Sequence, residues 1–178
     1  MAINKSVTAK NPVLSHSIKR DRYESVVDRL ELLIDDSTDI IAAMATVVAE
    51  LHNTFDHFHW TGFYRVTSPG HLQVGPYQGG HGCLEIPFAR GICGAAARTA
   101  KTQLVPDVND VEDHIACSTA TQSEIVIPII TDDRAVLAVL DVDSDILNAF
   151  DQIDQEYLEA IGAQLGARFS PPASGISR

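Results

Sequence analysis

Three cysteines, Cys83, Cys93 and Cys117, are the residues of this 178-residue chain best suited to nucleophilic chemistry. Free cysteine usually packs as a small hydrophobe, whereas Cys117 lies in the polar stretch HIACSTATQ, residues 114–122. A thiol on an accessible polar loop can form the reactive thiolate and reach a partner. Cys117 is therefore the candidate nucleophile, and an incidental surface thiol is the alternative.

Three carboxylates in apolar, strand-like segments form a second candidate set. Glu124 opens the segment EIVIPII, and Asp141 and Asp143 lie in VLAVLDVDS, residues 136–144. Asp141 and Asp143 are two residues apart on the predicted strand, so their side chains project from the same face. Burial and mutual repulsion raise the pKa of clustered carboxyl groups and keep a proton bound near neutral pH. We therefore expect a proton donor here; ordinary acids at a solvated strand end are the alternative.

The spacing of the cysteines argues against a metal site or a thioredoxin-like motif. Nine residues separate Cys83 from Cys93, and twenty-three separate Cys93 from Cys117, which matches no CxxC pattern. His81 could ligate a metal beside Cys83, but no second pair of ligands completes a site. We therefore predict that no metal is bound.

Composition limits the partners and the setting of the protein. The net charge of −11, from 13 Lys and Arg against 24 Asp and Glu, argues against nonspecific binding to nucleic acid or to an anionic membrane. No run of 18 apolar residues suggests a membrane span. The cysteine count is odd and no secretory apolar segment precedes the cysteines, so a reducing, cytoplasmic compartment is expected.

The elements that must position these residues form an α+β plan. Helical spacing of apolar residues predicts three long helices, and Ser37 or Thr38 is the expected N-cap of the second. Strand-like segments and turn residues predict two hairpins and two short strands, and the aperiodic residues 107–122 read as a functional loop. The predicted helices cover residues 19–34, 40–55, 92–100 and 150–169, and the predicted strands lie within 59–66, 71–79, 84–88, 102–108, 123–130 and 134–144.

These elements predict one domain, a central mostly antiparallel sheet of about six strands with the long helices packed on one face. The domain is expected to span residues 20–169, with a flexible N-terminal tail at residues 1–19 and a C-terminal tail at residues 170–178.

Five motifs give the chain a specific resemblance. They are WTGFY, GPYQG, GCLEIPFARGICGAA, DHIACSTATQSEIVIPI and VLDVDS, in this order. Their order and spacing resemble the free methionine-(R)-sulfoxide reductases, stand-alone GAF-domain proteins that reduce the free amino acid. The resemblance covers roughly residues 20–168 and implies a GAF-like fold.

The resemblance also implies roles for the cysteines. Cys117 would attack the sulfoxide sulfur and become a sulfenic acid, and Cys83 would resolve it as an intramolecular disulfide. Cys93 would be a second relay, with a buried core thiol as the alternative. An external thioredoxin would reduce the disulfide, no cofactor would be bound, and a homodimer is expected from the resemblance alone.

The same resemblance assigns the substrate-binding residues. Trp60 and Tyr64 would form an aromatic wall around the substrate methyl group, although aromatic residues on an early strand are more often core. The backbone amides around Ile115 and Ala116 would bind the substrate carboxylate. Three acids would share the proton donation and the binding of the ammonium group, in a division that the sequence leaves open: Glu124, Asp141 and Asp143.

Two other classes of function remain open at this point. A GAF sensor would bind a ligand, such as a nucleotide, without chemistry; such sensors are normally joined to output domains, and an acidic pocket would repel phosphate. A redox-regulated scaffold would form disulfides without turnover. Release of methionine from the free sulfoxide would separate the enzyme from both.

Overall fold

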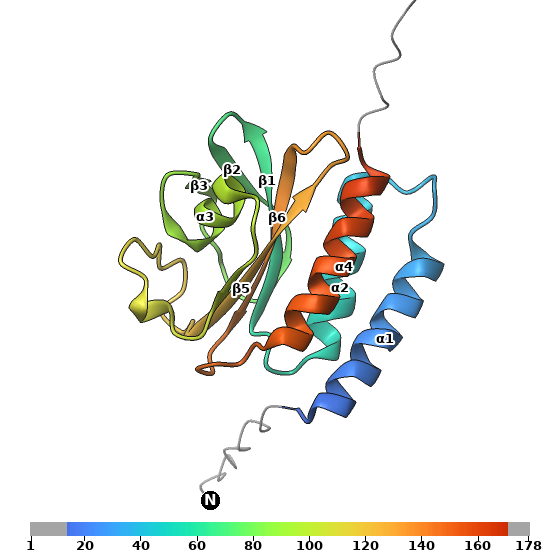
Figure 1. The fold of residues 1–178 in the computed structure, drawn as a ribbon, viewed down its shortest axis with the longest axis horizontal. Coiled ribbons are helices and arrows are strands. Elements are labelled where there is room, and N and C mark those ends of the chain that lie inside the picture. The colour runs from blue at the N-terminus through green and yellow to red at the C-terminus, as the bar shows by residue number, and fades with distance from the viewer. Residues whose placement is uncertain (1–13, 171–178) are drawn as a thin grey trace, which may run out of the picture.

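The computed structural model describes residues 14–170, which form six strands and four α-helices (Figure 1). The helices are α1 (His16–Leu33), α2 (Ile40–Thr54), α3 (Gly91–Thr99) and α4 (Gln152–Arg168), and a short 3₁₀ turn, η1, spans Val108–Asp110. The strands are β1 (Trp60–Ser68), β2 (His71–Gln78), β3 (Glu85–Pro87), β4 (Gln103–Val105), β5 (Ser123–Ile130) and β6 (Val136–Ser144). None of the helices in these residues is long and apolar enough to cross a membrane.

The strands form a single sheet in the order β3-β2-β1-β6-β5-β4, and every neighbouring pair is antiparallel. The three long helices lie together on one side of this sheet, and α3 lies on the other side with the loops around it (Figure 1). The predicted α+β architecture, a central antiparallel sheet with the long helices packed on one face, is confirmed.

Side chains point alternately to the two faces of the sheet, and this divides the buried apolar residues into two cores. Phe63, Ile125 and Leu140 face the long helices and are fully buried among their apolar side chains. Their neighbours Tyr64 and Val139 face the other way and pack with α3. Because successive strand side chains point to opposite faces, one face of the sheet serves the main core and the opposite face is left for a site.

The start of α2 differs from the sequence prediction. Its N-cap is Asp39, whose carboxylate accepts hydrogen bonds from the backbone amides of Ile41 and Ala42, and neither Ser37 nor Thr38 takes this position. Asp35 instead uses both hydroxyl side chains in a turn before the helix. Several good capping residues stand in a row here, and the local turn decided which one was used.

The first helix begins at His16, so residues 16–19, which the sequence assigned to the tail, belong to the folded domain. Lys19 is fully buried, and its ammonium group contacts Asp151 at 2.8 Å and Asp154 at 2.5 Å. The Tyr23 hydroxyl also donates to Asp154, at 2.8 Å. Residues 1–13 and 171–178, which hold the rest of the two predicted tails, lie outside the described residues.

Asp154 is the centre of this network, and Asp154→Ala is expected to lower the free energy of unfolding by about 3–5 kcal/mol, because it leaves Lys19 buried with one partner instead of two. Urea unfolding measures the change. The matched control is Glu156→Ala, which removes an exposed pair with Arg20 on the same two helices and should cost less than about 1 kcal/mol. Equal losses in both variants would contradict the assignment.

Candidate active site

The register of three strands creates the site. Trp60 on β1 pairs with Asp143 on β6, and Asp143 pairs in turn with Glu124 on β5. Two residues before Asp143 on β6, Asp141 pairs with Gly62 on β1 and with Val126 on β5. Since residues paired across a sheet share a face, an aromatic ring and three carboxylates are brought onto the face opposite the long helices.

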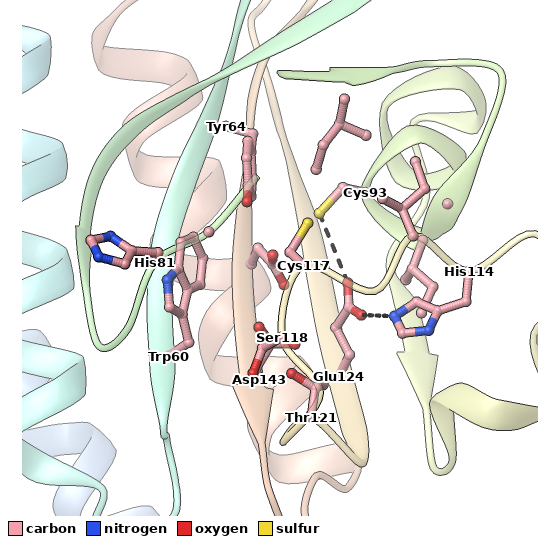
Figure 2. A pocket seen from close by; sticks show the side chains of 16 residues that line it. Trp60, Tyr64, His81, Cys93, His114, Cys117, Ser118, Thr121, Glu124 and Asp143 are labelled. Carbon is pink, nitrogen blue, oxygen red and sulfur yellow. Dashed lines mark hydrogen bonds and ion pairs between the residues drawn. The ribbon is translucent and has the colours of Figure 1, made fainter. Parts of the chain in front are cut away.

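Loops and α3 cover this face and enclose a pocket (Figure 2). The covering segments are residues 79–84 between β2 and β3, the N-terminal end of α3, and residues 106–122 between β4 and β5. The pocket is lined by Trp60, Tyr64, His81, Gly82, Ile86, Gly91, Ile92, Cys93, His114, Ile115, Cys117, Ser118, Thr121, Glu124, Asp141 and Asp143.

An aromatic row forms one side of the pocket. Trp60 stacks between Tyr64 and Tyr77, with ring centroids 5.7 Å and 5.4 Å apart and nearly parallel planes. Gly62 permits this arrangement, because a Cβ there would lie 2.5 Å from the Trp60 ring. The indole N–H donates to the carbonyl of Gly80 at 3.2 Å, which ties the residue 79–84 loop to the aromatic row.

The same loop lies flat on the aromatic side chains. A Cβ at Gly82 would meet the Tyr64 hydroxyl at 2.9 Å and the Trp60 ring at 3.0 Å. Gly79 adopts a positive φ of 111°, a conformation that L-residues with a Cβ rarely take. The glycines therefore hold the next residue, Cys83, close above the pocket.

Cys83 and Cys117 are joined by a disulfide with a Cα–Cα distance of 5.1 Å. Both are half-buried, and Cys117 lines the pocket while Cys83 does not. Cys93, on α3, is a free and buried thiol at the pocket floor. The structure thus pairs the two cysteines that the resemblance pairs, and the third lies within the same site.

The loop that carries Cys117 is anchored at both ends. The amide of Val108 donates to the carbonyl of Gln122 at 2.9 Å, and the amide of Gly91 donates to the backbone carbonyl of Asp113 at 3.1 Å. Gly91 has a positive φ of 71°, and a Cβ there would lie 3.1 Å from Ile115. The aperiodic segment that the sequence marked as a loop is therefore held against α3.

The three carboxylates are largely removed from water. Glu124 and Asp141 are each only 5% exposed, and Asp143 is half-buried. Burial raises the pKa of Glu124 well above its usual value, and the charges of Asp141 and Asp143 raise it further. Burial likewise raises the pKa of Asp141 to about 7 and that of Asp143 well above its usual value. At least one proton is therefore held by this cluster near neutral pH.

The partners of the carboxylates show what the pocket offers a ligand. The Cys93 thiol donates to Glu124 Oε1 at 3.8 Å, and His114 Nε2 lies 3.9 Å from Glu124 Oε2 (Figure 2). Burial lowers the pKa of His114 and raises that of Cys93. Asp141 Oδ1 is buried and accepts no hydrogen bond from the described residues. The cluster therefore combines a protonated acid with an acceptor able to bind a cationic or N–H group.

Cys93, Glu124 and Asp141 also place three ligand atoms within 4.8 Å of one another. Thiolate and carboxylate ligands at this separation could bind a divalent cation such as Zn²⁺. The sequence predicts no bound metal, and that stays a prediction.

The raised pKa of Asp141 has a consequence for stability. In the unfolded chain this carboxyl has its ordinary pKa of 3.8, whereas in the folded protein its pKa is about 7. Between these two pH values the folded state binds more protons than the unfolded state, so a rise in pH destabilises the fold.

Asp141→Asn keeps the shape but cannot ionise. Its free energy of unfolding should therefore gain on that of the parent protein as the pH rises from about 4 to about 7, by up to about 4 kcal/mol. Urea unfolding of both proteins across this pH range measures the difference, which includes the part that the Asp141 charge contributes by raising the pKa of Glu124 and Asp143. A difference that does not change with pH would overturn the assignment.

The structure brings together nearly every residue that the sequence singled out. Trp60, Tyr64, Cys93, Ile115, Cys117, Glu124, Asp141 and Asp143 all line the pocket, whereas Cys83 contributes through its disulfide and Ala116 is exposed outside the lining. Sequence reasoning missed Ser118, Thr121 and the glycine-flanked His81 as lining residues. Thr121 hydrogen-bonds Asp143, which partly offsets the rise in the pKa of that carboxyl. No feature of the sequence around Thr121 distinguishes it from the other polar residues of the loop.

Known proteins are similar to this chain in sequence and in fold. The family model described as a GAF domain matches residues 36–169. Protein YtsP of Bacillus subtilis is 43% identical over 79% of this chain and 86% of its own length. The free methionine-R-sulfoxide reductase of Escherichia coli is 33% identical over 83% of this chain and 88% of its own length. An X-ray structure is known for the Neisseria meningitidis enzyme of that name in complex with its substrate. Its sequence is 38% identical to this one, the match covers 90% of this chain and 95% of that chain, and the two folds superpose with a TM-score of 0.76. The chain therefore belongs to the GAF-domain family of free methionine-R-sulfoxide reductases.

Proposed function

We propose that this protein reduces free L-methionine (R)-sulfoxide to L-methionine, with Cys117 as the nucleophile. One observation carries the proposal: Cys117, bonded to Cys83, lines a pocket that also contains three buried carboxylates and an aromatic wall. A thiol, an available proton and an apolar surface are the three things that sulfoxide reduction requires. The E. coli and N. meningitidis relatives, which bear the name of this activity, support the same conclusion.

The reaction follows from these groups. The Cys117 thiolate attacks the sulfoxide sulfur while a protonated carboxyl group donates its proton to the sulfoxide oxygen. The oxygen passes to Cys117, the S–O bond of the substrate breaks, and the products are methionine and a cysteine sulfenic acid. The Cys83 thiol then attacks the sulfenic acid, which releases water and forms the Cys83–Cys117 disulfide. Thioredoxin returns both cysteines to thiols, with its own dithiol oxidised in exchange.

Cys93 is placed to assist as a proton-holding neighbour or as a second thiol relay. Its sulfur is buried against Glu124. Burial and the neighbouring carboxylates raise the pKa of the Cys93 thiol, so it forms little thiolate. Cys83 is the resolving thiol in this proposal because the Cys83–Cys117 pair is the one that is bonded.

The substrate fits the pocket in one orientation. Its methyl and methylene groups would pack on Trp60 and Tyr64, and its ammonium group would be held by ionised members of the carboxylate cluster. Its carboxylate would lie at the backbone amides of residues 115–117, because an anion is repelled by the acids and attracted by peptide N–H groups. The free ammonium group is thus part of recognition, which would make the free amino acid the substrate in preference to a residue within a peptide.

Three substrates test the proposal: the purified R and S epimers of free methionine sulfoxide, and the N-acetylated R epimer. Each is offered with thioredoxin, its reductase and NADPH. Release of methionine, or of N-acetylmethionine from the acetylated substrate, is measured alongside NADPH oxidation. Only the free R epimer should turn over well, because acetylation removes the charge that the acids bind. A GAF sensor or a redox-signalling module would release no methionine from any of them.

A further inference from the structure

The Cys83–Cys117 disulfide must be reopened from outside, and its two sulfurs have different surroundings. Cys117 faces the substrate pocket, whereas Cys83 lies outside the pocket lining, on the loop before β3. The residue after it, Leu84, is 74% exposed, although its carbonyl is fixed by a hydrogen bond from the amide of Val74 at 3.0 Å. A fixed backbone thus presents a large apolar side chain to solvent beside the half-buried bridge.

Charge also separates the two sides of the disulfide. Residues 75–84, GPYQGGHGCL, contain no Asp, Glu, Lys or Arg, in a chain of net charge −11. The chain leading to Cys117, residues 107–113, contains four acids, of which Asp110, Glu112 and Asp113 are exposed. The nucleophile in thiol–disulfide exchange is a thiolate anion, so acids near its path oppose its approach. The side of Cys83 is the more favourable path.

We propose that a protein dithiol docks on residues 77–84, uses Leu84 as its apolar anchor, and attacks the sulfur of Cys83 rather than that of Cys117. This inference rests on the proposed function, which requires the bridge to be recycled. The exposed edge of Tyr77 extends the same uncharged surface next to the aromatic row. Glu85, the nearest acid along the chain, is exposed at the start of β3, opposite Gln73 in the strand register, and marks the end of the uncharged surface.

The partner's thiolate forms a bond to Cys83 Sγ, the Cys83–Cys117 bond breaks, and Cys117 leaves as a thiolate. The partner's second thiol, having lost its proton, attacks its own first sulfur in the mixed disulfide and releases Cys83. The partner ends as a disulfide, and this protein ends with two reduced cysteines. Attack at Cys83 has the advantage of freeing Cys117 directly into the substrate pocket, ready for the next sulfoxide.

The first experiment compares Leu84→Ser with Leu32→Ser, using thioredoxin, its reductase and NADPH as the protein dithiol and dithiothreitol as the small one. Leu32 is 85% exposed on α1, on the far side of the long-helix layer from this loop (Figure 1). Leu84→Ser should lower the rate constant for reduction of the preformed bridge by subsaturating thioredoxin roughly tenfold, the value expected when a leucine contact is lost. Reduction by dithiothreitol, and both activities of Leu32→Ser, should stay at the parental level.

The second experiment locates the attacked sulfur. The oxidised protein is mixed with thioredoxin whose resolving cysteine is serine, and the trapped mixed disulfide is mapped by mass spectrometry. Linkage to Cys83 is expected. Linkage to Cys117, an unchanged rate constant for reduction of Leu84→Ser by thioredoxin, or a bridge that only dithiothreitol reduces would each overturn the proposal. Both experiments follow reduction of the preformed bridge and need no methionine sulfoxide, so failure of the proposed function would show separately, as absent methionine release with dithiothreitol.

Discussion

Cys117→Ser is expected to abolish methionine release completely while the protein stays folded. A serine hydroxyl is far less acidic than a thiol, so it supplies no useful anion near neutral pH, and it cannot form a sulfenic acid. The substitution removes only the proposed nucleophile, because serine occupies nearly the same space and Cys117 is half-buried on a loop held by other contacts. Methionine release with dithiothreitol as reductant measures the loss, and thermal melting of the reduced proteins checks the fold.

Cys83→Ser is the matched variant, because it removes the other half of the same disulfide. It should still form methionine in a single turnover, about one equivalent per protein, and then accumulate the Cys117 sulfenic acid, detectable with a dimedone-type reagent. The two variants lose the same bridge but differ in which step fails. If Cys117→Ser kept parental turnover, or if Cys83→Ser lost the first turnover as well, Cys117 would not be the attacking thiol.

Glu124→Gln is expected to lower the single-turnover rate by roughly 10²-fold or more, the usual effect of removing a group that takes part in proton transfer. Glu124 is buried, and it contacts both the Cys93 thiol and His114. Burial raises its pKa well above the usual value, so it carries a proton where an exposed glutamate would not. The amide keeps the size of the side chain but cannot release a proton to the sulfoxide oxygen. Rapid-quench measurement of methionine formed in the first turnover gives the rate.

Asp141→Asn and Asp143→Asn separate proton donation from ammonium binding. A residue that binds the ammonium group should weaken substrate affinity when it is made neutral, whereas a proton donor should slow the chemical step at saturating substrate. The exposed Glu156→Gln on α4 serves as the control for loss of one negative charge, and it should leave both quantities unchanged. Parental rates and affinities in all three pocket variants would show that the carboxylates take no part in the reaction.

The spacing of apolar and polar residues was sufficient to predict the helices and strands and the direction in which their side chains point. Asp141 and Asp143 share a face because strand side chains alternate, and Trp60 and Tyr64 share one for the same reason. Helical spacing of apolar residues gave the long helices, with errors only at ends such as Asp39, where neighbouring residues have similar capping propensity. The polar setting of Cys117 marked it as reactive from sequence alone. These properties depend on residues within a few positions of one another, which is why the sequence by itself determined them.

The tertiary structure decided how those pieces meet. Pairing of β6 with both β1 and β5 aligns Trp60, Asp143 and Glu124 in one row. The β5–β6 pairing is a hairpin that the sequence predicts, whereas the β1–β6 register depends on contacts between segments more than 60 residues apart in the chain. Cys83 becomes the partner of Cys117 because the glycine-rich loop at residues 79–84 and the polar loop at residues 106–122 meet over the same face of the sheet. The pKa values of the carboxylates depend on burial beneath α3 and the loop before β5. Distance and solvent exclusion are properties of the assembled fold. The sequence therefore identified the candidate residues, and only the folded chain brought them together in one pocket.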